Sequence, residues 1–393
     1  MREGAAVIAC RTDNPAVRRA FDALAAVMTA NGAWGHPEAV LEEAGGHVRI
    51  PAPPPATDDE PLLSVPVLCL PPVAALCLDG DGRIGVVDRA RELPETTRLT
   101  AERLAAFYDA VGKLDAHARE HPLFALDACR AVRDKLIAGR AGAVATDRLG
   151  ELDDPAARGR LLLESLLESR HFDLPGVGRV LLPLIDCLNH HGGAPTFQVA
   201  EGSAAVWVVN ARPAGTAEVF ARYRTLDPHD ALLSYGFVDE SHNLVRSVPL
   251  RVALEAGAVL DVAGTGMAPP AADAMPADVA DLRPWFPREV TVDDGHVRVS
   301  DINIPGPAAP WALRRVLGAL LARARPDAPG PERLMAVKRA ESAILAENRQ
   351  YYADLAALAD ACRDDANPCL ANVRHLCAVQ EARLAGHARR VGV

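Results

Sequence analysis

Two polar residues at the end of an apolar run are the first candidates for chemistry. Residues 180–185 are largely apolar, and they are followed by Asp186 and then by the neighbouring pair Asn189 and His190. A buried amide and imidazole must find hydrogen-bond partners, and such groups can bind the polar edge of a ligand. Taken alone, an Asn-His pair is more often a hydrogen-bonded structural corner. The pair therefore needs support from other parts of the sequence.

Three further side chains are suited to positioning a ligand. Arg170 can hold a carboxylate through two parallel hydrogen bonds, although a lone arginine is more often part of a surface ion pair. Tyr223 and Tyr235 can place hydroxyl groups in a pocket, although many tyrosines are core residues with one polar end. None of these residues identifies a function alone, so the interpretation depends on their order along the chain.

The elements around these residues indicate an α+β fold. Apolar residues at helical spacing predict a helix over residues 15–31, ended by Asn31-Gly32, and helices through most of residues 98–170. Helices are predicted again from Trp311. The proline-rich residues 51–55 and the stretch 263–281 are predicted loops. Strands are predicted at residues 39–41, 48–50, 63–69, 74–78, 197–199, 205–209, 218–223, 245–263 and 286–303.

Composition places the chain among soluble globular proteins. Its 393 residues allow two or three domains, and 49% of them are hydrophobic and 24% charged. A net charge of −10 argues against wholesale binding to nucleic acid or to an anionic membrane. No apolar run approaches the roughly 20 residues of a membrane span. The N-terminus lacks a signal-peptide pattern, so a cytoplasmic location is predicted.

The eight cysteines are scattered along the chain, which predicts reduced and mostly buried thiols. Cys362, Cys369 and Cys377 lie near His375 in the sequence. Their spacing lacks the close C-x-x-C pairs that are typical of zinc sites. We therefore predict no metal site.

Four motifs occur along the chain in the order S-R-x-F, P-L-I-D-x-L-N-H, A-G-x-x-E-V-x-x-x-Y and L-x-x-Y-G-F-V, beginning at Ser169, Pro183, Ala214 and Leu232. Together they resemble the SET-domain methyltransferases of the Rubisco large-subunit methyltransferase class. The helical block before Arg170 resembles the long insertion of that class. Residues 339–345 resemble a helix of its C-terminal helical domain. The resemblance therefore extends over most of the chain.

The resemblance implies a particular domain organisation within the α+β class. It implies a SET-type fold of small twisted β-sheets with a helical insertion, plus an all-helical C-terminal domain. Residues 1–94 and 171–260 would form the two parts of the SET domain, and residues 95–170 would form the insertion. Residues 261–393 would form the mainly helical domain that binds substrate or partner.

The activity of the family implies an N-methyltransferase that uses S-adenosyl-L-methionine (AdoMet) to methylate an amine. The leading substrate is a protein lysine, and an amine-containing small molecule is the other candidate. By the same resemblance, Tyr223 is the catalytic tyrosine and Tyr235 lines the amine channel. The implied cofactor-binding residues are Asn189, His190 and Arg170, and the implied substrate-binding residues are Asp186, Phe197 and Tyr235.

Two departures from the family pattern leave the substrate open. The glycine-x-glycine motif lets the backbone approach AdoMet in the family, and His47-Val48-Arg49 stands in its place here. The preceding Gly45-Gly46 is the candidate substitute for cofactor binding. Phe197 stands where the family often has a tyrosine, and Leu174 where a basic residue is usual. Two alternatives therefore remain: a SET-like enzyme acting on a small molecule or on AdoMet itself, and a non-catalytic SET-like peptide-binding protein.

Overall fold

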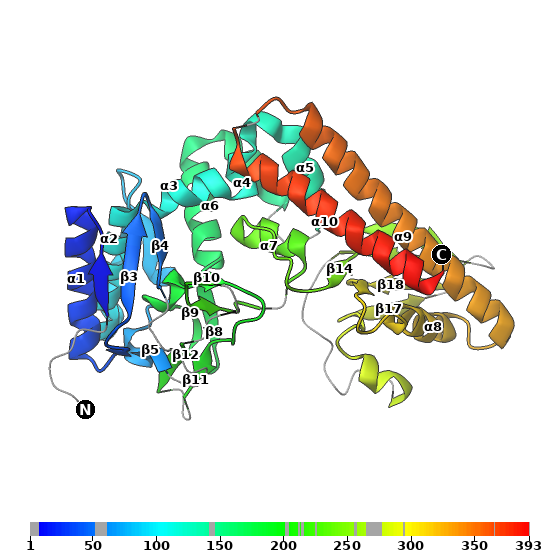
Figure 1. Ribbon diagram of the computed structural model, residues 1–393, viewed down its shortest axis with the longest axis horizontal. Coiled ribbons are helices and arrows are strands. Elements are labelled where there is room, and N and C mark those ends of the chain that lie inside the picture. Colours follow the sequence, from blue (N-terminus) through cyan, green and yellow to red (C-terminus); the bar gives the residue numbers. More distant parts are fainter. Residues whose placement is uncertain are drawn as a thin grey trace. The chain divides into compact units, whose positions relative to one another are not determined.

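The chain forms two compact units (Figure 1). The computed structural model describes residues 8–51, 61–140, 146–200, 204–210, 213, 216–224, 226–254, 258–264, 277–293, 295–364 and 366–392. Unit 1 comprises Met1–Arg119 and Gly150–Thr225, and unit 2 comprises Glu120–Leu149 and Leu226–Val393. The predicted insertion at residues 95–170 is therefore divided between the units. Residues 226–260, assigned above to the SET domain, lie in unit 2.

Helices α1 (Pro15–Ala30) and α2 (Glu95–Val111) pack side by side in unit 1 (Figure 1). Asn14 begins α1 by accepting a hydrogen bond from the backbone N–H of Ala16, and Pro15 suits the first helical position. The buried rings of Phe21 and Phe107 meet edge to face, with centroids 6.1 Å apart. The helical stretch continues with α3 (Lys113–Glu120) and α6 (Pro155–Glu168).

Small sheets, rather than one large sheet, form the remainder of unit 1. In the order β1-β3-β4, β1 (Ala9–Arg11) runs parallel to β3 (Val40–Ala44), which is antiparallel to β4 (His47–Arg49). The order β11-β12-β5-β2 joins β11 (Gln198–Val199), β12 (Ala205–Val209), β5 (Pro61–Pro66) and β2 (Trp34–Gly35). Two-stranded ladders pair β6 (Leu76–Leu78) with β7 (Ile84–Val86), β8 (His171–Leu174) with β9 (Gly178–Leu181), and β10 (Asn189–His190) with β13 (Phe220–Ala221).

Unit 2 combines helices with a four-stranded sheet of order β15-β16-β18-β17. The long helices α9 (Gly330–Ala361) and α10 (Pro368–Val391) run side by side (Figure 1), and α8 (Ala312–Ala324) packs on α9. Mixed small sheets and helices in both units confirm the α+β class. The sheet consists of β15 (Leu250–Ala253), β16 (Val259–Val262), β17 (Val290–Asp293) and β18 (His296–Val299). The remaining elements include α4 (Pro122–Ala125), α5 (Arg130–Ala138), α7 (Pro228–Tyr235), β14 (Leu244–Arg246) and β19 (Asn303–Pro305).

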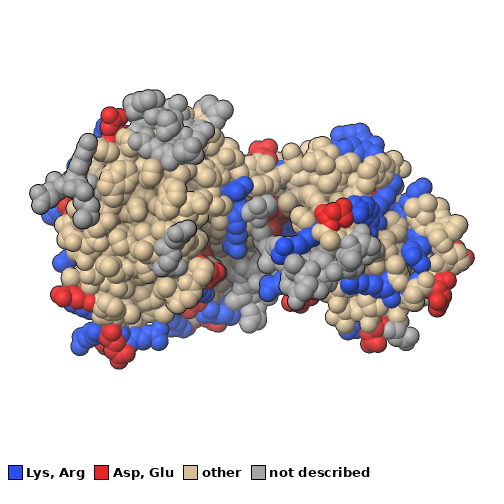
Figure 2. Space-filling model, turned by 90° about the horizontal axis from the view of Figure 1, so that it is seen from below, with Lys and Arg blue, Asp and Glu red and all other residues tan. Residues whose placement is uncertain are grey.

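Most of the predicted elements are present, but the stretches 245–263 and 286–303, each predicted as strand, are each divided into three short strands. The predicted strand at residues 63–69 stops at Pro66, and residues 67–69 form a 3-10 turn. Of the predicted loops, residues 52–55 and 265–276 lie outside the described residues. Within the described ranges, no helix has the length and apolar character needed to cross a membrane. Acidic and basic side chains both occur on the face shown in Figure 2.

A buried ionic cluster occupies the core of unit 2. The fully buried Arg140 donates from Nε to Asp230 Oδ1 at 2.9 Å, and from Nη2 to both carboxylate oxygens of Asp227 at 3.0 and 2.9 Å. Arg246 also donates to Asp230 Oδ1, and Gln380 Nε2 donates to Asp227 Oδ2 at 2.8 Å. Asp227 in addition caps α7 by accepting the backbone N–H of Asp230. The cluster thus connects α7, β14 and α10 around two carboxylates.

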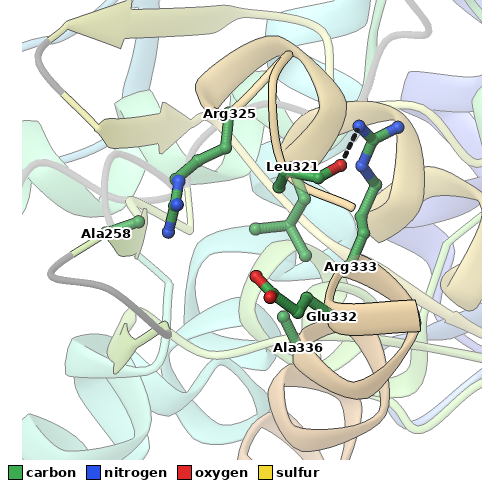
Figure 3. A pocket seen from close by; sticks show the side chains of 7 residues that line it. Ala258, Leu321, Arg325, Glu332, Arg333 and Ala336 are labelled. Carbon is green, nitrogen blue, oxygen red and sulfur yellow. Dashed lines mark hydrogen bonds between the residues drawn. The ribbon is translucent and has the colours of Figure 1, made fainter. Parts of the chain in front are cut away.

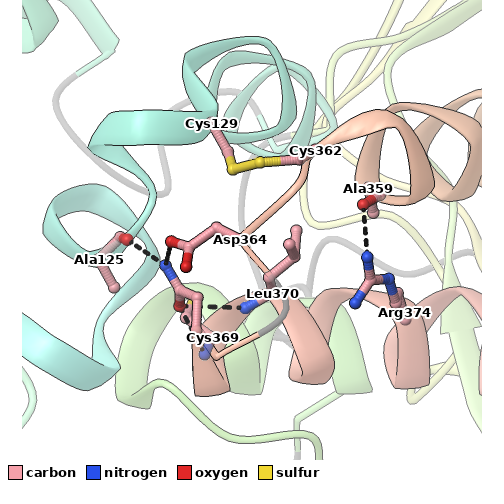
Figure 4. The surroundings of a disulfide bond; sticks show 9 residues. Ala125, Cys129, Ala359, Cys362, Asp364, Cys369, Leu370 and Arg374 are labelled. Atoms are coloured by element: carbon pink, nitrogen blue, oxygen red, sulfur yellow. Dashed lines mark hydrogen bonds between the residues drawn. A yellow bond between two sulfur atoms is a disulfide. The ribbon is translucent and has the colours of Figure 1, made fainter.

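A disulfide bond joins Cys129 and Cys362 within unit 2 (Figure 4). Their Cα atoms lie 6.1 Å apart, which is within the usual range for a disulfide. Beside the bond, Asn367 Nδ2 donates to the carbonyl of Ala125 at 2.8 Å, so the segment after α9 is also held to the end of α4 by a hydrogen bond. The prediction of reduced thiols is wrong for this pair, because cysteines far apart in sequence meet in the fold.

We expect Cys362→Ser to lower the free energy of unfolding by about 2–4 kcal/mol under oxidising conditions, because the bond closes a long loop in the unfolded chain. Urea unfolding followed by circular dichroism measures this loss. Reductant supplies the control: it should weaken the wild-type protein to the level of the variant and leave the variant unchanged. Wild-type stability that does not respond to reductant would contradict the bond.

Candidate functional site

The motif that contains Asn189 and His190 has an unusual backbone in unit 1. After β9, Leu184 adopts φ 67° and ψ −36°. The other described residues with positive φ are all glycines. A 3-10 turn over Ile185–Cys187 follows, and β10 begins directly at Asn189. A buried leucine rarely adopts positive φ, and such strain is concentrated at functional sites in proteins. The backbone thus singles out this segment independently of its motif.

Pairing of β10 with β13 brings the second and third motifs together. The two strands are parallel, with Asn189 opposite Phe220 and His190 opposite Ala221. Tyr223 follows β13, where its backbone N–H donates to His190 Nδ1 at 3.1 Å. The rings of His190 and Tyr223 lie 5.1 Å apart. Residues widely separated in the sequence therefore form one contact group, as the motifs predicted.

The hydroxyl of Tyr223 is fixed by the strained segment. It donates to the carbonyl oxygen of Leu188 at 2.6 Å, immediately before Asn189. A phenolic oxygen that donates one hydrogen bond keeps lone pairs that can accept another. The stacked ring of Phe197, with its centroid 6.3 Å away, borders Tyr223 on one side. Phe197 in turn meets Phe172 edge to face at 5.9 Å.

The partly buried Arg170 and the buried Asp186 form an ion pair beside this group. Arg170 Nη1 donates to the backbone oxygen of Asp186 at 2.8 Å and lies 3.6 Å from its carboxylate Oδ2. The hydroxyl of Tyr108 donates to the same Oδ2. Burial and the neighbouring Asp186 carboxylate raise the pKa of Tyr108 well above its ordinary value. Burial opposes the charge of Arg170, but the Asp186 carboxylate together with Tyr108, Tyr223 and Cys187 raises the pKa of the arginine above its ordinary value, so Arg170 stays cationic.

One donor of Arg170 remains available for a ligand. Its Nε is buried and has no hydrogen-bond partner among the described residues. A buried guanidinium N–H without an acceptor costs free energy, and a carboxylate is the acceptor that arginine binds most strongly. The site therefore offers an oriented cationic donor next to Asp186.

A second polar contact joins Asn189 to Glu218, and the residue after Glu218 bonds to the segment that follows His47-Val48-Arg49. Asn189 Nδ2 donates to Glu218 Oε1. Burial raises the pKa of Glu218, while the Asn189 hydrogen bond and the nearby Arg49 partly offset this effect. The backbone N–H of Val219 donates to the carbonyl of Ile50 at 2.9 Å. The end of β4 is thereby placed beside β13 and close to Asn189.

Gly45 and Gly46 form the turn between β3 and β4. Ala44 pairs with His47, and the two glycines between them have φ of 60° and 89°, as a type I′ hairpin turn requires. This geometry accounts for both glycines as turn residues, and their role in cofactor binding stays a prediction. In the following strand Val48 is buried in the core, whereas His47 and Arg49 are exposed.

Tyr235, Leu174 and the first residues of the third motif were also singled out in the sequence. Tyr235 belongs to unit 2, where it ends α7 and its ring stacks on Phe237 with centroids 5.7 Å apart. Its role in the amine channel stays a prediction. Leu174 is buried at the end of β8. Ala214 and Gly215 of the third motif lie outside the described residues.

Tyr108 and Glu218 are the contact residues that the sequence interpretation missed. Tyr108 lies on α2 next to the apolar stripe that contains Leu104, Phe107 and Val111, so it was indistinguishable from a core residue. Its hydroxyl was the available signal, because a buried phenol requires a hydrogen-bond partner. Glu218 was part of the third motif but was given no role.

No family model matches this chain, and no curated protein matches it. The chain is similar to solved structures of LSMT. The SET domain of LSMT bound to lysine and AdoHcy shares 13% identity at a TM-score of 0.45, covering 97% of this chain and 92% of that chain. The SET domain of LSMT bound to methyllysine and AdoHcy shares 15% identity at a TM-score of 0.43, covering 96% and 91%.

Rubisco LSMT bound to AdoMet shares 14% identity with this chain at a TM-score of 0.39. The match covers 96% of this chain and 90% of that chain. At these identities and TM-scores, the function proposed below depends on the contacts of this chain's own residues.

Proposed function

We propose that this protein is an AdoMet-dependent N-methyltransferase that acts on a protein lysine. The observation that supports this most is the contact group formed by Arg170, Asp186, His190 and Tyr223 around the strained 184–190 segment. A cationic donor, a carboxylate and an oriented hydroxyl lie within one small region of unit 1. These are the groups needed to hold a charged cofactor and an incoming amine.

The chemistry of Arg170 supports AdoMet as the cofactor. The orphaned Nε of Arg170 matches the carboxylate of the amino-acid portion of the cofactor. Asn189 and His190, at the paired end of β10, would hold the remainder of the molecule. When bound, the cofactor supplies an electrophilic methyl group on a sulfonium.

Tyr223 and Asp186 act on the amine. A lysine amine has a pKa near 10.4, so its deprotonation at pH 7 costs about 4–5 kcal/mol. Asp186 would attract the ammonium form to the site, the ammonium would release its proton to solvent, and Tyr223, held by Leu188, would accept an N–H of the neutral amine and align its lone pair. Alignment of the reacting atoms within about 3–3.5 Å is the main contribution that such a site makes. Phe172 and Phe197 exclude water from one side of Tyr223.

We expect Tyr223→Phe to lower the rate of methyl transfer at least about 100-fold, because the amine loses its aligning oxygen. The assay incubates purified full-length protein with methyl-labelled AdoMet and an extract of its own cells, and separates labelled protein from labelled small molecules. Tyr351→Phe is the matched control, since it removes a hydroxyl that bonds the Lys135 carbonyl in unit 2. It should retain wild-type activity.

Two results would count against the proposal. Label transfer at the wild-type rate in Tyr223→Phe would remove this residue from the mechanism. Label found only in low-molecular-weight products would replace the protein lysine by a small-molecule substrate. Calorimetric titration with AdoMet and AdoHcy adds a direct check, because a non-catalytic peptide-binding protein would bind neither.

A further inference from the structure

A pocket in unit 2 lies apart from the residues considered so far. It has a volume of about 360 Å³ and is formed by the C-terminal end of α8, the N-terminal end of α9 and Ala258 just before β16 (Figure 3). This volume is at the lower end of the range for pockets that bind small molecules. Its lining consists of Ala258, Leu321, Arg325, Ala328, Glu332, Arg333 and Ala336.

The pocket contains two charged side chains of opposite sign that are not paired with each other. Figure 3 shows Arg325, from the end of α8, and Glu332, from the first turn of α9, on the walls of the same hollow. Within the described residues, neither side chain has a hydrogen-bond or ion-pair partner. Glu332 is exposed and Arg325 is partly exposed, so both charges are accessible to a ligand in the pocket: Arg325 can pair with an anionic group and Glu332 with a cationic one.

The third charged residue of the pocket, Arg333, holds the loop between α8 and α9 in place. Arg333 Nη2 donates to the carbonyls of Pro326 and Ala328, at 3.2 and 3.0 Å, and so fixes the loop between α8 and α9. Its Nε is buried without a hydrogen-bond partner among the described residues. The guanidinium charge is not neutralised by carbonyls, so it adds to the attraction for an anionic group. Leu321 and Ala336 supply an apolar surface between the charges.

We propose that this pocket binds a free amino acid with an apolar side chain. Its carboxylate would pair with Arg325, its ammonium with Glu332, and its side chain would lie on Leu321 and Ala336. A zwitterion can pair with Arg325 and with Glu332 at the same time, whereas a ligand with charge of one sign would leave one of these two side chains without a partner.

The test is calorimetric titration of the full chain with L-leucine. Leucine has no side-chain amine, so its binding does not report on the proposed site for a lysine substrate. We expect saturable binding in the millimolar range or tighter. N-acetyl-leucine lacks the cationic amine and leucinamide lacks the carboxylate, so each should bind at least about tenfold more weakly. The dipeptide Leu-Leu separates the two charges, and tighter binding of the dipeptide than of leucine would overturn the free amino acid as ligand.

Variants connect the binding to the pocket. Arg325→Met and Glu332→Gln should each weaken L-leucine binding at least about tenfold. The matched controls are Arg363→Met and Glu347→Gln, exposed residues that lie beyond and farther along α9, and they should bind as the wild type does. No detectable binding of L-leucine, or binding that survives Arg325→Met and Glu332→Gln unchanged, would overturn the proposal.

Discussion

Replacement of Arg140 by methionine should lower the free energy of unfolding of unit 2 by about 3–5 kcal/mol, because it leaves buried carboxylates without their main counter-charge. Arg140 is fully buried, and its guanidinium contacts both Asp227 and Asp230. Methionine fills a similar volume but offers no donor. Arg246, which donates to Asp230, would then be the arginine of the cluster left to balance the charges of Asp227 and Asp230.

The loss should depend on pH in a defined direction. Burial and the neighbouring Asp227 raise the pKa of Asp230 to about 6, whereas Arg140 lowers the pKa of both aspartates. An acid whose pKa is higher in the folded state stabilises the fold below its unfolded pKa of about 3.9, and that contribution is lost as the pH rises through 6. Without Arg140 the raised pKa of Asp230 should rise further, and the lowered pKa of Asp227 should rise as well. The loss in free energy of unfolding caused by Arg140→Met should therefore be larger at pH 8 than at pH 5.

Urea unfolding of the full chain, followed by circular dichroism at both pH values, measures this effect. Arg363→Met serves as the control, because Arg363 is exposed and should change stability by no more than about 0.5 kcal/mol. The double variant Arg140→Met with Asp227→Asn should recover part of the loss, since asparagine still caps α7 and carries no charge. A single variant as stable as wild type at pH 8 would show that the cluster contributes little.

The same cluster illustrates what the sequence could not predict. Arg140, Asp227 and Gln380 are individually ordinary polar residues, and their burial is decided by packing between elements far apart in the chain. The disulfide between Cys129 and Cys362 has the same origin, because cysteine spacing carries no information on which residues meet. Periodicity, by contrast, depends only on neighbouring residues, and it predicted α1, β12 and the C-terminal helices correctly.

The candidate site was predictable to the extent that its residues belong to contiguous motifs. His190 and Tyr223 meet because short segments, β10 and β13, pair in parallel, and their order along the chain indicated a shared site. Tyr108 was not predictable in this way, because it reaches Asp186 from a helix whose pattern is that of a core helix. The glycine pair Gly45-Gly46 had both a turn and a cofactor interpretation in the sequence, and the backbone angles supply the turn.

Replacement of Arg170 by lysine should weaken AdoHcy binding by about 10- to 100-fold, the second large effect that we expect. The planar guanidinium uses Nη1 for Asp186 and leaves the buried Nε for a carboxylate. Lysine keeps the positive charge beside Asp186 but lacks that second, fixed donor. A charge-assisted hydrogen bond contributes about 1.5–3 kcal/mol, and each 1.4 kcal/mol corresponds to a factor of ten in affinity.

Charge retention is the reason to choose lysine over an apolar residue. Arg170→Met would leave the Asp186 carboxylate buried without its cationic partner, with Tyr108 and the weak thiol donor Cys187 as its side-chain donors, so lost binding could result from a damaged fold. With lysine, the unfolding transition should stay near that of the wild type while calorimetry reports the weaker binding. Arg160→Lys, an exposed change on α6, is the matched control and should alter neither quantity. If Arg170→Lys binds AdoHcy as tightly as wild type, the free Nε does not hold the cofactor carboxylate, and the contacts of Arg170 with Asp186 serve the fold of unit 1 alone.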